Sequence, residues 1–158
     1  MTPTTYRHTQ RSPLCLLLYA VGVVILASAW SVRHEPVVPW VLSGSAASVL
    51  LLAPSFHYLR VEDQFDRLAI RFGPLPIFRR SVEYGEIESA QIGRTTLLDG
   101  WGIHWSLRGG WVWNIWGRDC VVIRFRDGGR LLVGTDDVDR LHRFLQSKID
   151  EHSPRIGR

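Results

Sequence analysis

Side chains that could carry out catalysis are few in this 158-residue chain, and their spacing does not bring them together. His104 has no acidic residue at a spacing that would orient its ring, and Cys120 begins an apolar run typical of a buried strand. No nucleophile elbow, zinc-protease helix, phosphate-binding loop or dinucleotide fingerprint occurs. We therefore expect that the protein is not an enzyme. The remaining candidate groups are Asp99, His142, Asp136 and Asp137.

The two cysteines, Cys15 and Cys120, lie far apart, and neither has a partner at a metal-ligand spacing. In a chain of this kind, such a pattern gives neither a zinc site nor a disulfide framework. We predict no metal and no cofactor.

Three arginines, Arg71, Arg79 and Arg80, flank a turn at residues 73–76 and could bind an anionic lipid headgroup. Three glutamates at positions 83, 86 and 88 would oppose that role. One alternative is a solvated strand edge, whose charges discourage pairing with another chain. Another is unspecific attraction to an anionic membrane surface. The sequence leaves all three interpretations open.

The overall charge does not indicate nucleic-acid binding. From Leu59 onward, 16 lysines and arginines stand against 14 acidic residues, so the net charge is only +2 and the signs are interleaved. A nucleic-acid-binding domain would gather Lys and Arg on one face. We therefore expect no nucleic acid among the partners.

Five tryptophans surround the sequence Arg108-Gly109-Gly110, which predicts a hairpin. A three-residue loop with a glycine at positive φ would pair Trp105 with Trp113 and leave His104 opposite Asn114 on the other face. Cross-strand aromatic pairs stabilise sheets, so we expect the first pair, together with Trp101, in the core.

The other two tryptophans, Trp111 and Trp116, lie near turns, where core and exposed positions are equally compatible with the pattern. Trp116 has the parity of His104 and Asn114, which makes it the best candidate for an exposed aromatic side chain. These four residues form the second predicted binding surface.

The elements that position these residues follow from hydrophobic periodicity. Alternation with a period of two predicts strands over 68–72, 78–82 and 86–92, and a hairpin of 120–125 with 130–133. Thr135-Asp136-Asp137 can cap a helix whose apolar positions run from Val138 to Ile149 along one face.

Two long uncharged runs precede the strands. Pro13–Val32 has 20 residues, enough to cross a bilayer core, and Val37–Leu59 follows after a short connector. Trp30 and Trp40 flank the connector, as expected for side chains at a membrane interface. Small residues, including Gly44 and Ser48, would allow close helix packing. We predict a transmembrane helical hairpin.

The orientation follows from Arg7 and Arg11, which precede the first span and place both termini and the soluble domain in the cytoplasm. The predicted topology is therefore a membrane protein with two passes. An alternative is a signal peptide cleaved at Ala27-Ser28-Ala29.

The segments Leu68–Pro74, Arg79–Arg80 and Tyr84–Ser89 resemble the bacterial membrane-anchored pleckstrin-homology-like (PH-like) domains. The stretches 100–103, 110–114 and 128–136 are similar to a pattern in small members of that group. The resemblance covers Tyr58 to Ile149 and the preceding hairpin. The resemblance implies a fold and a location in the bacterial inner (plasma) membrane, with no catalytic residues to transfer.

Together these observations predict an α+β chain with a transmembrane hairpin, a PH-like antiparallel bent sheet or small barrel, and one C-terminal amphipathic helix. We expect a non-catalytic membrane-anchored module that presents a protein-interaction or scaffolding surface to a partner or a second copy. The alternative is a module that binds anionic lipid headgroups. The predicted divisions are a cytoplasmic tail (1–12), the hairpin (13–59), the PH-like domain (60–150) and a basic tail (151–158).

Overall fold

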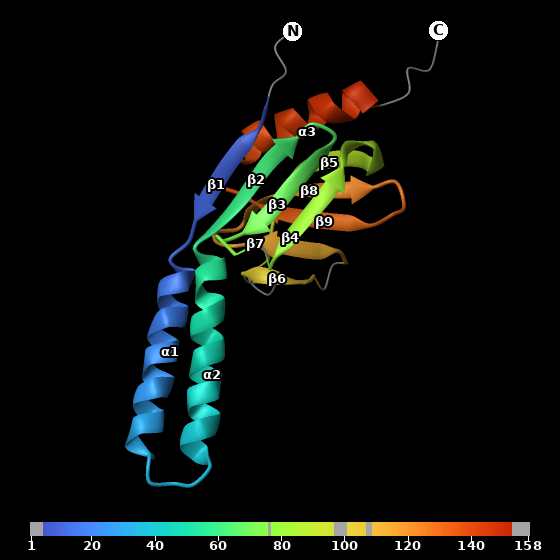
Figure 1. Cartoon of the computed structure of the whole chain (residues 1–158). Coiled ribbons are helices and arrows are strands. Elements are labelled where there is room, and N and C mark those ends of the chain that lie inside the picture. The colour runs from blue at the N-terminus through green and yellow to red at the C-terminus, as the bar shows by residue number, and fades with distance from the viewer. Residues whose placement is uncertain (1–4, 76, 97–100, 107–108, 153–158) are drawn as a thin grey trace, which may run out of the picture.

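The computed structural model describes residues 5–75, 77–96, 101–106 and 109–152 (Figure 1). It confirms the α+β class, with two apolar helices near the N-terminus, two sheets and a C-terminal helix. The helices form a hairpin that projects from the sheets, and the C-terminal helix lies at the opposite end of the domain (Figure 1).

The hairpin consists of α1 (Leu14–Ser31) and α2 (Val38–Leu52). Both helices are long and apolar enough to cross a membrane when the 3-10 turn after α2 is included, and most of their side chains are exposed. Leu50 packs against Gly22 so closely that a Cβ atom added there would lie 2.5 Å from the leucine side chain, whereas a Cβ atom added at Gly44, predicted to mediate packing, would meet nothing within 4 Å. Gly22 and Ala29, which are among the small residues of the first run expected to allow close packing, are buried, as is Ala46 in α2.

The second apolar run ends earlier as a helix than its composition suggested. After Leu52 the chain forms a 3-10 turn, η1 (Ala53–Phe56), because Pro54 has no N–H group to continue the α-helical pattern. Tyr58 and Leu59 then begin strand β2 (Tyr58–Gln64), and Leu59 is fully buried in the domain core.

The first sheet contains an element that sequence analysis did not identify. Strand β1 (Arg7–Arg11) precedes α1 and pairs antiparallel with β2, Arg11 lying opposite Tyr58. The sheet continues through β3 (Arg67–Phe72) and β4 (Arg79–Glu83) in the order β1-β2-β3-β4. Both connections from the helical hairpin thus enter the domain as neighbouring strands.

The second sheet has the order β5-β8-β9-β7-β6. It confirms the expected strand at β5 (Ile87–Arg94), which a short 3-10 turn, η2 (Tyr84–Glu86), precedes, and the hairpin of β8 (Asp119–Phe125) with β9 (Arg130–Gly134). The expectation of a purely antiparallel sheet was wrong, because β7 (Trp111–Asn114) pairs in parallel with β9. The edge strand β6 (Gly102–Trp105) pairs with β7 alone.

The register of the β6–β7 hairpin is shifted by two residues from the prediction. Trp105 lies opposite Trp111, and His104 lies opposite Val112 instead of Asn114. The parallel partner β9 explains the shift, because it holds Gly110 against the backbone of Arg130, where a Cβ atom would lie 2.8 Å from neighbouring atoms. The hairpin closes with a hydrogen bond from Ser106 N to the Gly110 carbonyl at 2.9 Å, so three residues separate the paired positions, as predicted, but one position earlier in the chain.

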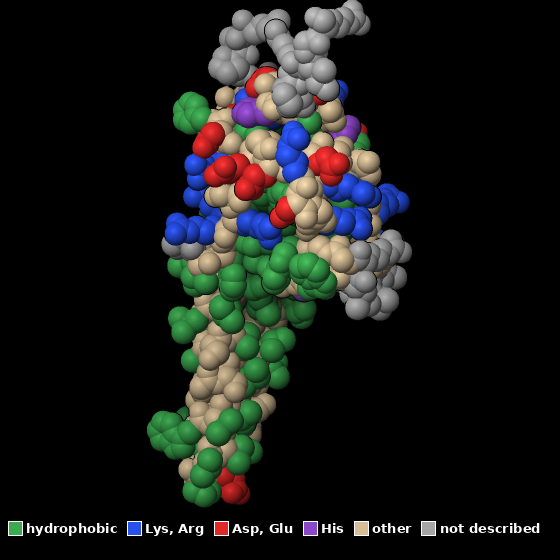
Figure 2. Space-filling view, turned by 90° about the vertical axis from the view of Figure 1, so that its right-hand side faces the viewer, with side chains coloured by type: hydrophobic (Ala, Val, Ile, Leu, Met, Phe, Trp, Pro, Cys, Tyr) green, Lys and Arg blue, Asp and Glu red, His purple; other side chains and the backbone are tan. Residues whose placement is uncertain are grey.

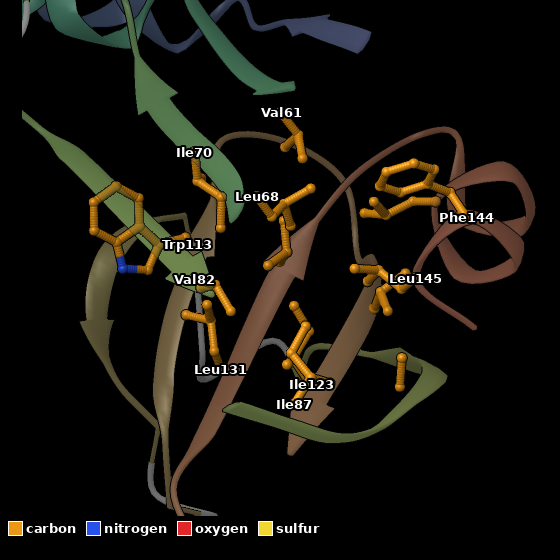
Figure 3. Close-up of a cluster of buried hydrophobic side chains, with 14 of the residues drawn as sticks. Val61, Leu68, Ile70, Val82, Ile87, Trp113, Ile123, Leu131, Phe144 and Leu145 are labelled. Carbon is orange, nitrogen blue, oxygen red and sulfur yellow. The ribbon is translucent and has the colours of Figure 1, made fainter. Parts of the chain in front are cut away.

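The core lies between the two sheets and continues under α3 (Val138–His152). Ile70 and Val82 come from the first sheet, Ile123 from the second, and Leu145 from the helix (Figure 3). The Thr135 side chain accepts a hydrogen bond from Asp137 N at 3.1 Å, which confirms the predicted helix start. All four buried positions of α3 belong to the predicted apolar face: Leu141, Phe144, Leu145 and Ile149.

Candidate functional site

The candidate anion site is built on neighbouring strands of the first sheet. Arg60, Arg71 and Arg79 lie opposite one another on β2, β3 and β4 and form a row across the sheet. Adjacent like charges repel, and the row is partly compensated by Glu62, whose carboxylate lies 3.3 Å from Arg71 Nη2. Glu62 therefore opposes the arginine row, a role that sequence analysis had assigned to the later glutamates.

A cavity of about 400 Å³ opens beside this row, at the β3–β4 turn. Arg71, Arg79 and Arg80 all line it, together with Glu62 and the turn residues from Gly73 to Leu75. All three arginines singled out from the sequence line this cavity. Arg80, however, lies on the opposite side of its strand from Arg79, and it also lines a second cavity of about 330 Å³ together with Phe125 and Asp127.

Arg80 has an unusual environment for an arginine. It lies opposite the buried Ile70, and its guanidinium stands 5.9 Å from the centre of the Phe125 ring. Burial lowers the pKa of Arg80 from its usual value, since desolvation disfavours the charged form. In the part of the chain that the structure describes, no carboxylate forms an ion pair with it. A charge held in this way favours an anionic ligand.

The turn that borders the cavity is packed against the end of the helical hairpin. Gly73 has φ +58°, and a Cβ atom there would lie 2.5 Å from Ser55 Cα. Its N–H group donates to the Tyr58 carbonyl at 2.7 Å. The candidate site therefore lies directly beside the point where the chain leaves α2.

The tryptophans divide differently from the prediction. Trp113 is buried, as expected, and packs at 5.8 Å against Phe72 of the facing sheet. Trp101 and Trp105 are 48% and 61% exposed, so their expected place in the core was wrong. β6 is the edge strand of its sheet; its Ile103 still packs against the core, whereas Trp105 at its end and Trp101 just before it are exposed.

The exposed tryptophans form two pairs. Trp101 stacks on Trp116 with ring centres 4.4 Å apart, and Trp105 meets Trp111 edge to face at 5.7 Å. Trp116 is 38% exposed, in agreement with its selection as an exposed aromatic residue.

The polar residues grouped with Trp116 do not share its exposure. Asn114 is fully buried, and its Nδ2 atom donates to the Gly117 carbonyl at 3.0 Å. His104 is half-buried on β6, opposite Val112. The structure therefore gives Asn114 a role in shaping the β7–β8 turn and separates it from the tryptophan surface.

The catalytic candidates are dispersed. Among the described residues, no three His, Cys, Asp or Glu side chains are grouped as a metal site would require. Cys15 and Cys120 are buried at separate positions, and the His142 ring contacts the Ala90 carbonyl at 3.2 Å. Asp99 lies outside the described residues.

Asp136 and Asp137 have a partner that the sequence did not indicate. The ring of His8, on β1, contacts both carboxylates. These aspartates therefore tie the strand before α1 to the start of α3, in addition to their place at the helix N-terminus.

A scan against protein-family models and a search of curated proteins find no match to this chain.

Proposed function

We propose that this protein is a membrane-anchored, PH-like module that binds an anionic lipid headgroup at the cavity beside the β3–β4 turn. The observation that carries the proposal is the presence of Arg71, Arg79 and Arg80 in the lining of that cavity. Guanidinium groups bind phosphate in a bidentate geometry, which suits them to phospholipid headgroups.

The charge balance of the cavity supports an anionic ligand. Glu62 neutralises one arginine of the row through its contact with Arg71. Arg79 and Arg80 lack an ion pair with any described residue, so they are available to a phosphate group. A phosphate would also relieve the desolvation of Arg80, because it brings a compensating charge to a half-buried cation.

The position of the cavity supports a lipid as the source of that phosphate. In the proposed topology, α1 and α2 span the inner membrane and both termini are cytoplasmic. The cavity then lies next to the end of α2, at the depth of the headgroups. An anionic cytoplasmic leaflet attracts basic segments that lie this close to its surface.

The scaffolding function expected from the sequence has weaker support. Its best residue, Trp116, lies beside the helix entry: the Gln10 side chain, two residues before Ser12, donates to the Trp116 carbonyl at 3.0 Å. A protein partner would have to approach this residue next to the proposed membrane surface. Headgroup binding is therefore the function that we favour.

The test uses the full-length protein in a neutral detergent and short-chain lipids, with binding measured by calorimetry. We expect dihexanoyl phosphatidylglycerol to bind and dihexanoyl phosphatidylcholine not to bind. The double variant Arg79→Gln/Arg80→Gln should weaken binding by about tenfold or more, the loss expected for one or two charge-assisted hydrogen bonds.

The matched control is Arg94→Gln/Arg124→Gln, which removes the same charge at exposed positions on the other sheet. It should change the dissociation constant by less than about twofold, since remote surface charges are screened by salt. The proposal would be refuted if the two lipids bound equally well, or if both double variants lost the same amount of affinity for dihexanoyl phosphatidylglycerol.

A further inference from the structure

Six exposed apolar side chains surround the place where the helical hairpin joins the domain. We call them the collar; they are Leu75, Ile77, Trp101, Trp105, Trp111 and Trp116. Leu75 and Ile77 lie in the β3–β4 turn, and the four tryptophans lie in the segment that runs from just before β6 to the β7–β8 turn.

Contacts with the helix ends place these segments at one level. The Ser12 hydroxyl donates to the Ile115 carbonyl at 3.2 Å, so the residue before Trp116 touches the chain just before α1. Gly102, next to Trp101, faces the Phe56 ring in η1, and Gly73 packs on Ser55. Ile77 and Trp111 line one shallow groove between the two sheets.

The two figures agree with this placement. In Figure 1, β6 lies at the lower edge of the domain, level with the upper ends of α1 and α2. Figure 2 shows hydrophobic side chains that continue from the helices onto the underside of the domain, with Lys and Arg side chains in a band above them. This arrangement is complementary to a bilayer surface: the apolar underside would face the acyl chains, and the basic band above it would lie at the level of the phosphates.

The connection between helices and sheets fixes the height of the collar. β1 leads into α1 and β2 follows α2 after a short turn, and these two strands are paired with each other. Ser12 N also donates to the His57 carbonyl at 3.3 Å, which continues the pairing between the two linkers. The domain therefore lacks a long linker on which it could move away from the helix ends.

We propose that the collar is a membrane-docking surface that inserts into the interface of the leaflet from which α1 and α2 emerge. Tryptophan is the side chain best suited to this region, because its ring is largely apolar and its N–H group reaches water or headgroups. The inference rests on the anchoring part of the proposed function and is independent of headgroup binding at the arginine cavity.

The test places spin labels on the full-length protein in liposomes and compares accessibility to oxygen with accessibility to a polar nickel chelate. Labels are introduced by Ile77→Cys and Trp111→Cys. The aqueous control is Phe65→Cys, at the 95% exposed tip of the β2–β3 turn, and the lipid control is Val23→Cys in the middle of α1. Cys15 and Cys120 remain, because both are buried.

We expect the collar labels to favour oxygen over the nickel chelate, as the Val23 label does, although at shallower depth. A collar label with the aqueous behaviour of the Phe65 label would overturn the inference while leaving the anchor intact. Low accessibility of the collar labels to both oxygen and the nickel chelate would also overturn the inference, since protein and not lipid would then cover the collar. An aqueous Val23 label would refute the membrane anchor itself.

A second measurement avoids changes to the collar. Trp30→Phe/Trp40→Phe removes the tryptophans at the far end of the hairpin and leaves the collar as the main exposed source of fluorescence. We expect lipids brominated near the headgroup to quench this variant more strongly than lipids brominated near the chain end. Equal, weak quenching by both would contradict docking.

Discussion

Gly134, the last residue of β9, shows at the scale of a single residue how closely the backbone of the second sheet is packed. A Cβ atom there would lie 2.2 Å from Asn114 Oδ1 and 2.9 Å from Asn114 Cα. Asn114 cannot move aside, because it is buried and its amide donates to the Gly117 carbonyl. We expect Gly134→Ala to lower the free energy of unfolding by about 1–3 kcal/mol, the usual cost of overpacking.

Chemical denaturation of the full-length protein in mild detergent measures this effect. Gly85→Ala is the control, since a Cβ atom at Gly85 meets nothing within 4 Å, and it should change stability by less than about 0.5 kcal/mol. If both variants lower the free energy of unfolding by a similar amount, Asn114 moves to make room for the added methyl group.

Residue types alone indicated Arg71, Arg79 and Arg80, because basic side chains on both sides of a turn must lie near each other. Sequence could not indicate Glu62, which reaches the row only through the β2–β3 register. Nor could it show that Arg80 is half-buried, since Phe125, the ring beneath its guanidinium, belongs to the other sheet.

At the scale of elements, the β3–β4 turn joins the candidate site to the helical hairpin through Gly73. This glycine combines a positive φ with a close approach to Ser55 and Pro54. We expect Gly73→Ala to destabilise the domain by about 1–3 kcal/mol more than Gly128→Ala. Gly128 is the matched control, because it also has a positive φ, +86°, but a Cβ atom added there would meet nothing within 4 Å.

Thermal unfolding of both variants, followed by near-ultraviolet circular dichroism, separates the cost of a non-glycine residue at positive φ from the cost of the clash with Ser55 and Pro54. Gly128→Ala should show only the backbone cost of about 1–2 kcal/mol. If Gly73→Ala lowers the stability no more than Gly128→Ala does, the β3–β4 turn is not packed tightly against the end of the helical hairpin.

Elements with strong local patterns were predictable, and those defined by distant partners were not. α3 and the β8–β9 hairpin have clear periodicity and turn residues, so their bounds agree with expectation. β1 is short and polar, and it is a strand only because β2 pairs with it. The β6–β7 register depends likewise on the parallel contact of β7 with β9.

At the scale of the whole molecule, the two ends of the described chain close the domain together. Tyr6, just before β1, stacks on Phe144 of α3 at 5.4 Å, and Tyr84 meets the same ring at 6.0 Å. Tyr84 also donates a hydrogen bond to Asp63 Oδ1 at 2.8 Å. Burial raises the pKa of both tyrosines above the usual value near 10.0, and Asp63 raises that of Tyr84 further.

These shifts predict alkaline unfolding of the domain that α3 closes. Below pH 10 both hydroxyls are protonated in the folded and unfolded states, so their contribution to stability is constant. As the pH rises above 10, only the unfolded chain releases the protons, and stability falls by about 1.4 kcal/mol per pH unit for each tyrosine. At pH 8, the double variant Tyr6→Phe/Tyr84→Phe should be less stable than the wild type by about 1 kcal/mol, because the hydrogen bond to Asp63 is lost. Between pH 10 and 11 the variant should lose stability more slowly, because it has no hydroxyl protons at these positions to release. Denaturant titrations of the full-length protein at pH 8, 10 and 11 measure both effects. If the free energy of unfolding falls equally with pH in the wild type and the variant, the two tyrosine hydroxyls do not cause the alkaline unfolding.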